Sequence, residues 1–229
     1  MTQGFKQFYV DAPLAVGNRV ALPENLQHRL RTVLRNREGV ELNLMNGKDG
    51  VFTAMLEDGK ARWATVTDQT KPFSALPPRT LFLGQPKRDA WETVLRQATE
   101  LGVTTLVPLH TDYTVASTIN TARAHALMVE AAEQCERMCL PTLTPPQPLQ
   151  KALAAWHTAN PNEKILWADE RLSTPTPIPT ATAVLVGPEG GFSPDEQAWL
   201  ETQLYVVPIS LGSTVLRTDT AVVATLAKL

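Results

Sequence analysis

Residues 187–192 read Gly-Pro-Glu-Gly-Gly-Phe and lie between an apolar run and the start of a helix. The run before this loop, Ala183–Val186, is short, apolar and partly β-branched, which predicts a buried strand. Residues 193–196 (Ser-Pro-Asp-Glu) predict a helix N-terminus, because a serine cap is followed by proline and, three residues after the cap, by glutamate. Glycines let such a loop turn tightly and approach a ligand closely. A strand, a glycine loop and a helix in this order are typical of an α/β domain.

The glycine loop matches neither of two phosphate-binding motifs. The P-loop ends in Gly-Lys followed by Ser or Thr, whereas Phe192 follows Gly191 here. The dinucleotide fingerprint has glycines at relative positions one, three and six, and the glycines here stand at one, four and five. The loop also lacks a cation and carries Glu189, which does not suit a phosphate. Two interpretations remain open, a ligand of another kind or a tight connection without a ligand.

The composition bounds the class of protein. The 229 residues suffice for one large domain or two small ones. A net charge of −2 argues against a protein that coats nucleic acid without specificity. Residues 1–37 nevertheless hold six basic and two acidic side chains, which favours either a contact with a phosphate backbone or a solvated helix face. Because the sequence has neither a signal-peptide pattern nor a bilayer-spanning run, we expect a soluble, cytoplasmic protein that does not bind a membrane.

Cysteine and histidine give no metal-binding pattern. Cys135 and Cys139 lie four residues apart on an expected helix and are too few for a disulfide framework. The four histidines are scattered, without the spacing of metal ligands. We therefore expect two free thiols and no metal.

The first part of the chain has the pattern of a small β domain. Residues 1–70 combine an amphipathic helix at 23–36 with short strands at 40–44, 51–56 and 61–67, which predicts a small, mostly β barrel. Turns are expected at Asn46-Gly47 and at Asp58-Gly59. The proline-containing residues 71–79 are expected to form a linker.

Residues 80–229 alternate strands and helices, which predicts an α/β domain with a mainly parallel sheet. In such sheets, ligands bind beyond the carboxyl ends of the strands, and the glycine loop is expected at one of these ends. The expected strands are 80–84, 103–109, 165–168, 183–186 and 206–211. The expected helices are 89–101 with Asp89 as cap, 121–138, 149–158, 194–204 and one from about 219.

A second loop is expected at another strand end. Residues 211–221 read Leu-Gly-Ser-Thr-Val-Leu-Arg-Thr-Asp-Thr-Ala. Its single cation, Arg217, could form a surface ion pair with Asp219, which is the ordinary place for an arginine. The hydroxyl and carboxylate side chains at 218–220 can cap a helix.

The two loops together resemble the RsmE family of ribosomal RNA methyltransferases, which belongs to the SPOUT class. The sequences GPEGGFSPDE and LGSTVLRTDTA carry this resemblance. Supporting matches are Phe5–Val10, His28 with Val33–Arg35 and Gly39, Thr99–Val103, and Ala131–Cys135 with Arg137. The chain departs from the family where Thr214 and Cys139 replace frequent basic residues and where Glu136 replaces a glycine. These departures reduce the positive charge near the RNA path.

The resemblance implies a PUA-like RNA-binding β-barrel domain over residues 1–70 and a SPOUT trefoil-knot domain over residues 80–229. It also implies a homodimer, the cofactor S-adenosylmethionine, and 3-methyluridine in 16S ribosomal RNA of the small subunit as the product. The implied RNA contacts are Lys6, Arg31, Arg35 and Arg137. The implied cofactor contacts are Val186, Gly187, Pro188, Glu189, Gly190, Gly191, Leu211, Gly212, Val215, Leu216, Thr218 and Ala221.

The chemistry of this family agrees with the two loops. A sulfonium donor is cationic and therefore suits a loop with Glu189 and no cation. The uridine N3 must lose its proton in order to attack the methyl group, and Arg217 is expected to stabilise the developing uracil anion as the main catalytic residue. Glu189 is expected to act either as a base or as a structural acceptor. Two alternatives remain: a knotted methyltransferase that acts on a transfer RNA base or a ribose 2′-hydroxyl, and an RNA-binding assembly factor without catalysis.

Overall fold

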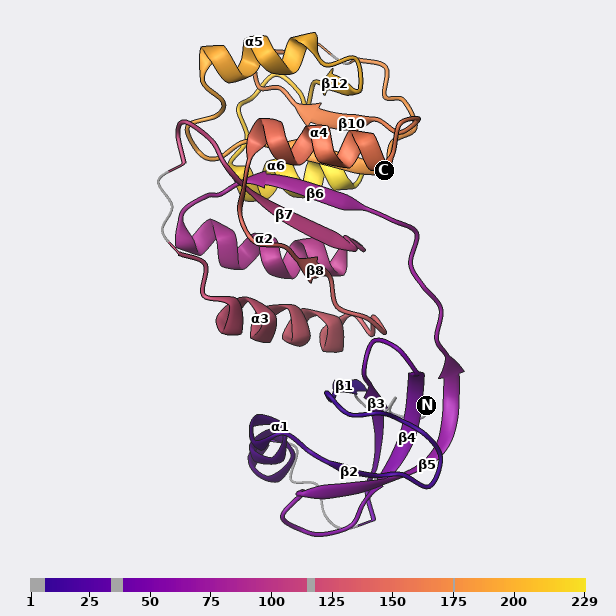
Figure 1. The fold of residues 1–229 in the computed structure, drawn as a ribbon. Coiled ribbons are helices and arrows are strands. Elements are labelled where there is room, and N and C mark those ends of the chain that lie inside the picture. Colours follow the sequence, from indigo (N-terminus) through magenta and orange to yellow (C-terminus); the bar gives the residue numbers. More distant parts are fainter. Residues whose placement is uncertain (1–6, 34–38, 115–117, 175) are drawn as a thin grey trace. The chain divides into compact units, whose positions relative to one another are not determined.

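The computed structural model describes residues 7–33, 39–114, 118–174 and 176–229. These residues form two compact units (Figure 1). The first unit takes the described residues up to Ala75 together with Val129–Leu140, and the second takes Leu76–Met128 together with Pro141–Leu229. The first is built on a mixed sheet and the second on a parallel sheet.

The first unit has a curled five-stranded sheet in the order β1-β3-β4-β5-β2. The pairing of β1 with β3 is parallel and the other pairings are antiparallel. Strands β1 and β2 were not predicted, because three residues are too few to display an alternating pattern. The strands are β1 (Gln7–Tyr9), β2 (Arg19–Ala21), β3 (Glu41–Met45), β4 (Gly50–Leu56) and β5 (Trp63–Pro72).

The helix expected over 23–36 takes a different form. Helix α1 spans Glu24–His28, and a π-helical turn, η1, follows over Arg29–Val33. Leu26 and Leu30 are buried, as the amphipathic pattern predicts. The wider π-turn changes the helical period, which a pattern search based on 3.6 residues per turn does not detect. Residues 34–36 of the expected helix lie outside the described residues.

The predicted turn at Asn46-Gly47 joins β3 to β4 and fixes a neighbouring segment. The Asn46 Oδ1 accepts hydrogen bonds from the N–H groups of Lys48 at 3.0 Å and Asp49 at 2.9 Å. The Asp49 Oδ2 accepts from the N–H of Leu14 at 2.9 Å and from the Asn46 side chain at 2.6 Å. The bond from Leu14, followed by that from Asn46, holds the pKa of Asp49 below its ordinary value.

Strand β5 begins later and ends later than predicted. Instead of residues 61–67, it covers Trp63–Pro72 and enters the segment expected to be a linker. Ala61 has a φ of 54° and donates its N–H to the Asp58 carbonyl, so the preceding turn extends through it. At the other end, Pro72 lies opposite Gly50, where a β-carbon would stand 2.3 Å from the Lys71 carbonyl oxygen. Only glycine permits this close pairing.

Residues 129–140 belong to the first unit although they follow it by more than fifty residues. The Glu133 carboxylate holds this segment against the first unit. Its two oxygens accept hydrogen bonds from the N–H of Tyr9 at 3.1 Å and from Arg29 Nη1 at 2.6 Å. The Gln7 side chain donates to the Arg137 carbonyl at 3.2 Å. The sequence analysis limits the first domain to residues 1–70 and therefore does not include residues 129–140 in it.

The second unit has a parallel sheet in the order β12-β10-β11-β6-β7-β8, with β9 also paired to β7. The strands are β6 (Thr80–Gly84), β7 (Thr105–His110), β8 (Thr142–Leu143), β9 (Gln147–Pro148), β10 (Ile165–Ala168), β11 (Ala183–Val186) and β12 (Val206–Ile209). The helices are α2 (Arg88–Glu100), α4 (Leu149–Ala159), α5 (Pro194–Thr202), α6 (Thr218–Leu226) and the part of α3 (Thr121–Gln134) up to Met128. The predicted alternation is confirmed, although Lys87 and not Asp89 is the cap of α2.

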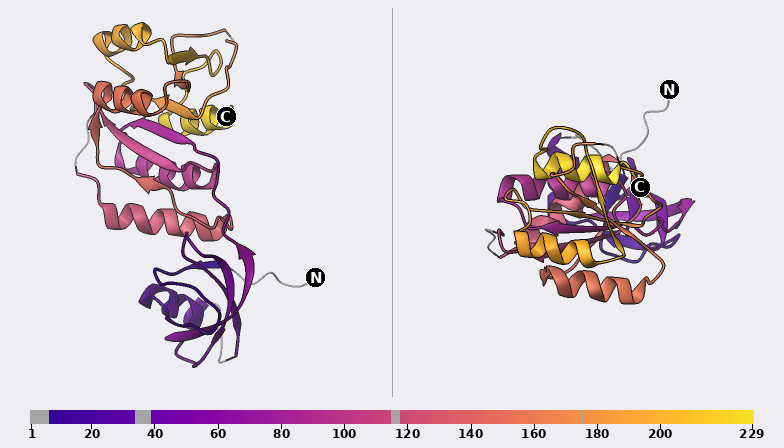
Figure 2. Two further views of the ribbon diagram at one scale, coloured as in Figure 1. Left: turned by 45° about the vertical axis from the view of Figure 1, so that its right-hand side comes forward. Right: turned by 90° about the horizontal axis from the view of Figure 1, so that it is seen from above.

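Helices cover both faces of this sheet, as the view from above in Figure 2 shows. On one face, α2 and α6 pack against alternate strand residues such as Leu83, Leu166 and Val184. On the other face, α4 and α5 cover Phe82, Trp167 and Leu185, among others. Successive residues of one strand therefore enter different cores, which is why these strands are apolar throughout.

After β12, at the edge of the sheet, the chain returns toward the centre. Ser210 is held against the β10–β11 connection, because its Oγ donates to the Leu172 carbonyl at 2.7 Å and its N–H donates to Thr176 Oγ1 at 3.2 Å. Helix α6 then packs against α2, β11 and β10. The chain therefore passes from the edge strand β12, along the β10–β11 connection, to a helix at the centre of the sheet.

Candidate functional site

The carboxyl ends of β10, β11 and β12 and the start of α2 enclose a cavity of about 710 Å³, here called the strand-end cavity. This volume lies within the range of small-molecule sites. The two sequence-predicted loops form two of its walls. All residues expected to contact a cofactor line it: Val186, Gly187, Pro188, Glu189, Gly190, Gly191, Leu211, Gly212, Val215, Leu216, Thr218 and Ala221.

The glycine loop is shaped by close contacts that exclude side chains. Gly191 has a φ of 68°, and its N–H donates to the Pro188 carbonyl at 2.9 Å. A β-carbon on Gly84, at the end of β6, would stand 2.4 Å from Pro188 Cδ. A β-carbon on Gly190 would meet the Tyr113 β-carbon at 3.1 Å. These glycines let the loop lie directly on the sheet end.

The predicted cap of α5 holds the far end of the glycine loop. The Ser193 Oγ accepts from the N–H of Glu196, and the Ser193 N–H donates to the Glu196 carboxylate, which together form a capping box. The second Glu196 oxygen accepts from the N–H of Asp112 at 3.0 Å. The cap therefore also fixes the segment after β7 against this loop.

The second predicted loop contacts the first one. Thr218 is buried, and its Oγ1 donates to the Gly187 carbonyl at 3.4 Å. At the other end of this loop, the Gly212 N–H donates to Ser210 Oγ at 3.2 Å. Both ends are thereby fixed, whereas Val215 in the middle exposes 79% of its surface.

A third wall, residues 168–172, was not identified from the sequence. Asp169 is 3% exposed, and its carboxylate accepts from Arg171 Nε at 2.9 Å and Nη2 at 2.7 Å. Arg171 also pairs with Glu201 at 2.9 Å and lies over the Trp167 ring. The bond to Asp169 is the main cause of the raised pKa of Arg171. The predicted strand 165–168 could have indicated this wall, because its carboxyl end meets the same edge of the sheet.

The start of α2 forms the fourth wall, and Glu189 connects it to the glycine loop. The Glu189 Oε1 accepts from the backbone N–H of Lys87 at 2.9 Å. Asp89, Ala90 and Thr93 complete this wall. Of the two roles expected for Glu189, this bond corresponds to the structural acceptor.

The strand-end cavity is acidic. Its described lining includes five carboxylates and only two cations, Lys87 and Arg217. The Asp169 carboxylate is paired with Arg171, and the Glu189 carboxylate accepts from a backbone N–H. Glu170 is exposed, and its Oε1 lies 2.8 Å from the place of a β-carbon on Gly191. Such a lining favours a ligand with a positive charge.

Arg217, the expected catalytic residue, lines the strand-end cavity at the N-cap position of α6. Its side chain is exposed and its backbone is extended, with a φ of −66° and a ψ of 154°. The next residue, Thr218, is the one bonded to Gly187. The anchored threonine therefore fixes the backbone from which the guanidinium extends.

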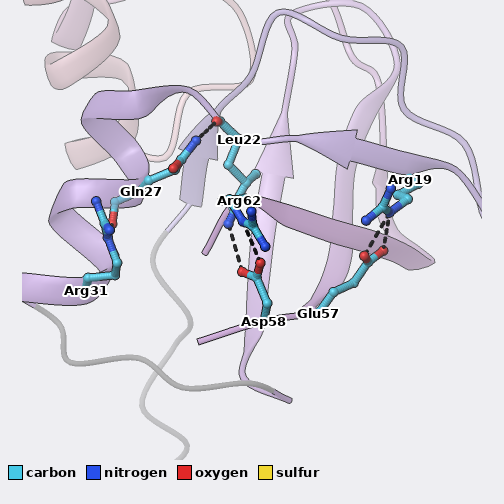
Figure 3. Close-up of polar contacts among 7 residues, drawn as sticks. All are labelled: Arg19, Leu22, Gln27, Arg31, Glu57, Asp58 and Arg62. Atoms are coloured by element: carbon cyan, nitrogen blue, oxygen red, sulfur yellow. Dashed lines mark hydrogen bonds and ion pairs between the residues drawn. The ribbon is translucent and has the colours of Figure 1, made fainter. Parts of the chain in front are cut away.

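The expected RNA contacts lie in different environments. Lys6 and Arg35 lie outside the described residues. Arg31 is exposed on η1, and its Nε donates to the Gln27 carbonyl at 3.2 Å (Figure 3). Figure 3 also shows the exposed Arg19 and Arg62 on the same unit, paired with Glu57 and Asp58. Arg137 is only 8% exposed.

The described residues give no sign of a metal centre or a membrane span. No group of three His, Cys, Asp or Glu side chains in this part of the chain is placed to hold a metal ion. Cys135 and Cys139 are free thiols, as predicted. None of the described helices is both long and apolar enough to cross a bilayer.

Comparison with known proteins shows that the second part of the chain is an RNA methyltransferase domain. Residues 74–229 match the family model of the RNA methyltransferase domain. Two relatives called ribosomal RNA small subunit methyltransferase E are each 32% identical to the chain. That of Rickettsia conorii aligns over 98% of this chain and 94% of its own, and that of Synechocystis over 88% and 69%. This chain belongs to the family of ribosomal RNA small subunit methyltransferase E.

A solved structure supports the same conclusion. The Neisseria gonorrhoeae ribosomal RNA small subunit methyltransferase E, bound to S-adenosyl methionine, is 27% identical to this chain with a TM-score of 0.80. The match covers 97% of this chain and 95% of that one. The fold predicted from the resemblance is confirmed: a SPOUT-type α/β domain with a parallel sheet, preceded by a small curled β domain.

Proposed function

We propose that this protein transfers a methyl group from S-adenosylmethionine to N3 of a uridine in 16S ribosomal RNA of the small subunit. The strand-end cavity carries this proposal, because three strand-end loops and the start of α2 enclose an acidic space of ligand size. The Neisseria gonorrhoeae relative is bound to S-adenosyl methionine, which is a cation at its sulfur. A cationic methyl donor matches the lining, whereas a nucleotide phosphate does not.

The residues present fit this cofactor. Gly187, Gly190 and Gly191 leave backbone groups open to the cavity, because they carry no side chains. Leu211, Val215 and Leu216 offer apolar contacts for an adenine ring. Glu170 supplies a carboxylate for a cationic group. When bound, the cofactor supplies an electrophilic methyl group, and the chain supplies position and charge.

Arg217 is the proposed catalytic residue. The uracil N3 must give up its proton to solvent water before or as it attacks the methyl group, and this proton loss develops negative charge on the ring that the new N–C bond then removes. A guanidinium at the cavity mouth stabilises that charge, which is the kind of electrostatic assistance that contributes most in many enzymes. Glu189 is assigned a structural role, because it holds the N–H of Lys87.

The first unit is the proposed RNA-binding part. We assign residues 1–70 to a PUA-like domain, residues 71–79 to a linker and residues 80–229 to the methyltransferase domain, with β5 continuing to Pro72 and residues 129–140 packed in the first unit. Arg31 is exposed and suits a phosphate contact, and Lys6 and Arg35 remain expected contacts. The burial of Arg137 favours a structural role for that side chain.

We further propose that the protein acts as a cytoplasmic homodimer without a metal ion.

Mapping modified nucleotides by mass spectrometry tests this function. Small-subunit RNA from a strain without the gene should lack one 3-methyluridine, and the purified protein with S-adenosylmethionine should restore it. Methylation of a transfer RNA or a ribose 2′-hydroxyl instead would contradict the substrate assignment. Absence of cofactor binding at millimolar concentration in a calorimetric titration would favour a non-catalytic assembly factor.

A further inference from the structure

A second cavity, of about 450 Å³, lies on the other face of α2, and we call it the α2–α3 cavity. Asp89, Ala90 and Thr93 line the strand-end cavity, whereas Arg88, Trp91, Glu92 and Leu95 line the α2–α3 cavity. The helical period places these two sets on different faces of α2. Lys87 lines both cavities. The two spaces are therefore separated by one helix and adjoin at its N-terminus.

The two cavities have opposite charge. Among its described lining residues, the α2–α3 cavity has the cations Lys87, Arg88 and Arg123 and the single carboxylate of Glu92. The strand-end cavity has five carboxylates and two cations in the same part of the chain. Methyl transfer to RNA brings together a cationic donor and a polyanionic acceptor. Two adjoining cavities of opposite charge suit two such partners.

The Glu92 carboxylate pairs with both Arg88 and Arg123 and neutralises only one of their two positive charges. Arg123 Nη2 pairs with Glu92 Oε2 at 2.8 Å, and Arg88 Nε pairs with Glu92 Oε1 at 3.4 Å. The bond from Arg123 is the main reason why the pKa of Glu92 lies below its ordinary value. The Arg88 side chain is 82% exposed, so most of its guanidinium remains open to an anion. Guanidinium groups bind phosphate through paired hydrogen bonds.

We propose that the α2–α3 cavity holds a phosphate of the RNA strand beside the nucleotide that is methylated. This inference rests on the proposed function, because it needs an RNA acceptor at the strand-end cavity. The volume also exceeds what a phosphate alone requires, and Trp91, Leu95 and Leu127 give an apolar floor for an attached sugar or base. Arg88 and Arg123 position the acceptor and take no part in the transfer itself.

The test compares Arg88→Glu with Arg88→Lys and with the control Lys151→Glu. Lys151 is an exposed cation on α4 that lines neither cavity. The substrate is small-subunit RNA from a strain that lacks the gene. Arg88→Glu should raise the KM for this RNA roughly tenfold, which corresponds to loss of one charge-assisted contact. The slope of log KM against log salt should fall by about one. Cofactor affinity, measured by calorimetry, should not change.

Arg88→Lys should recover most of the salt dependence, because the charge returns. The phosphate site is wrong if Arg88→Glu and Lys151→Glu have the same KM and salt slope. It is also wrong if Arg88→Glu weakens cofactor binding as much as RNA binding. Failure of the wild-type protein to methylate this RNA is a separate result and contradicts the proposed function itself.

Discussion

The carboxylate of Glu170 lies over the α-carbon of Gly191, so that a β-carbon at residue 191 would stand 2.8 Å from Glu170 Oε1. The two residues belong to the loops that follow the neighbouring parallel strands β10 and β11. Gly191 is needed both for its φ of 68° and for the space that the carboxylate occupies. Unlike Asp169, Glu170 has no ion pair with a cation of the described residues. Its charge is therefore available to a ligand.

The Glu170→Gln variant should lose affinity for cationic ligands of the strand-end cavity. We expect roughly tenfold weaker binding of S-adenosylmethionine, because a charge-assisted interaction becomes a neutral one. Three ligands identify the charge that is recognised. S-adenosylmethionine carries a sulfonium and an ammonium group, S-adenosylhomocysteine carries only the ammonium group, and 5′-methylthioadenosine carries neither. Calorimetry on each gives the affinities.

The control for this series is Glu100→Gln, which removes an exposed carboxylate at the end of α2 that does not line the strand-end cavity. Binding of 5′-methylthioadenosine should be unaffected by either substitution. Equal losses for all three ligands in Glu170→Gln would mean that Glu170 acts by shaping the cavity and not through its charge.

Replacement of Arg217 should separate binding from turnover. Arg217→Ala is expected to retain S-adenosylmethionine affinity and to lower the single-turnover rate about 10²- to 10³-fold, as loss of one preorganised donor does elsewhere. Arg217→Lys should retain part of the rate, because the charge remains while the planar donor fork is lost. An unchanged single-turnover rate in Arg217→Ala would exclude this residue from the mechanism.

The contact between Gly84 and Pro188 predicts a packing defect. In Gly84→Ala, the new β-carbon would lie 2.4 Å from Pro188 Cδ and 2.7 Å from Pro188 N, so the glycine loop has to move. We expect a destabilisation of about 1–3 kcal/mol, typical of overpacking, together with weaker cofactor binding. Gly59→Ala is the control, because no atom lies within 4 Å of its added β-carbon. Thermal unfolding and calorimetry measure both effects, and equal behaviour of the two variants would contradict the prediction.

Asp49 should make the stability of the first unit decrease at low pH. Its pKa is lower in the folded state, mainly because of the hydrogen bond from Leu14. Its contribution is therefore complete above the unfolded pKa of about 3.9 and is lost as the pH falls through the lower folded value. Asp49→Asn should reduce stability against urea at pH 7, and the difference from wild type should shrink near pH 3. A difference that does not change between these two pH values would contradict this assignment.

The sequence predicted the elements whose local pattern and tertiary role agree. Strand β11 and the capped start of α5 were found at their correct residues, because Ala183–Val186 is buried on both faces and Ser193 and Glu196 cap each other locally. Both loops of the strand-end cavity followed from their place after predicted strands. Short strands such as β8 and β9 were not predicted, because two residues carry no period.

Other features depend on contacts between distant residues, which a single sequence does not encode visibly. The wall at 168–172 contains no glycine pattern, and it forms because β10 lies between β11 and β12. The placement of residues 129–140 depends on the bonds of Glu133 to Tyr9 and Arg29. The return of the chain from the edge strand β12 to α6 at the sheet centre depends on the order of all the strands, which the residue pattern alone does not give.

All lining residues of the strand-end cavity belong to the second unit. A ligand that binds only the folded form of one unit stabilises that unit by mass action, by about 2.7 kcal/mol at one hundred times its dissociation constant. The methyl donor would therefore act as a folding ligand for the larger of the two units. The cell's supply of this metabolite would therefore add to the resistance of the second unit to heat and to proteases.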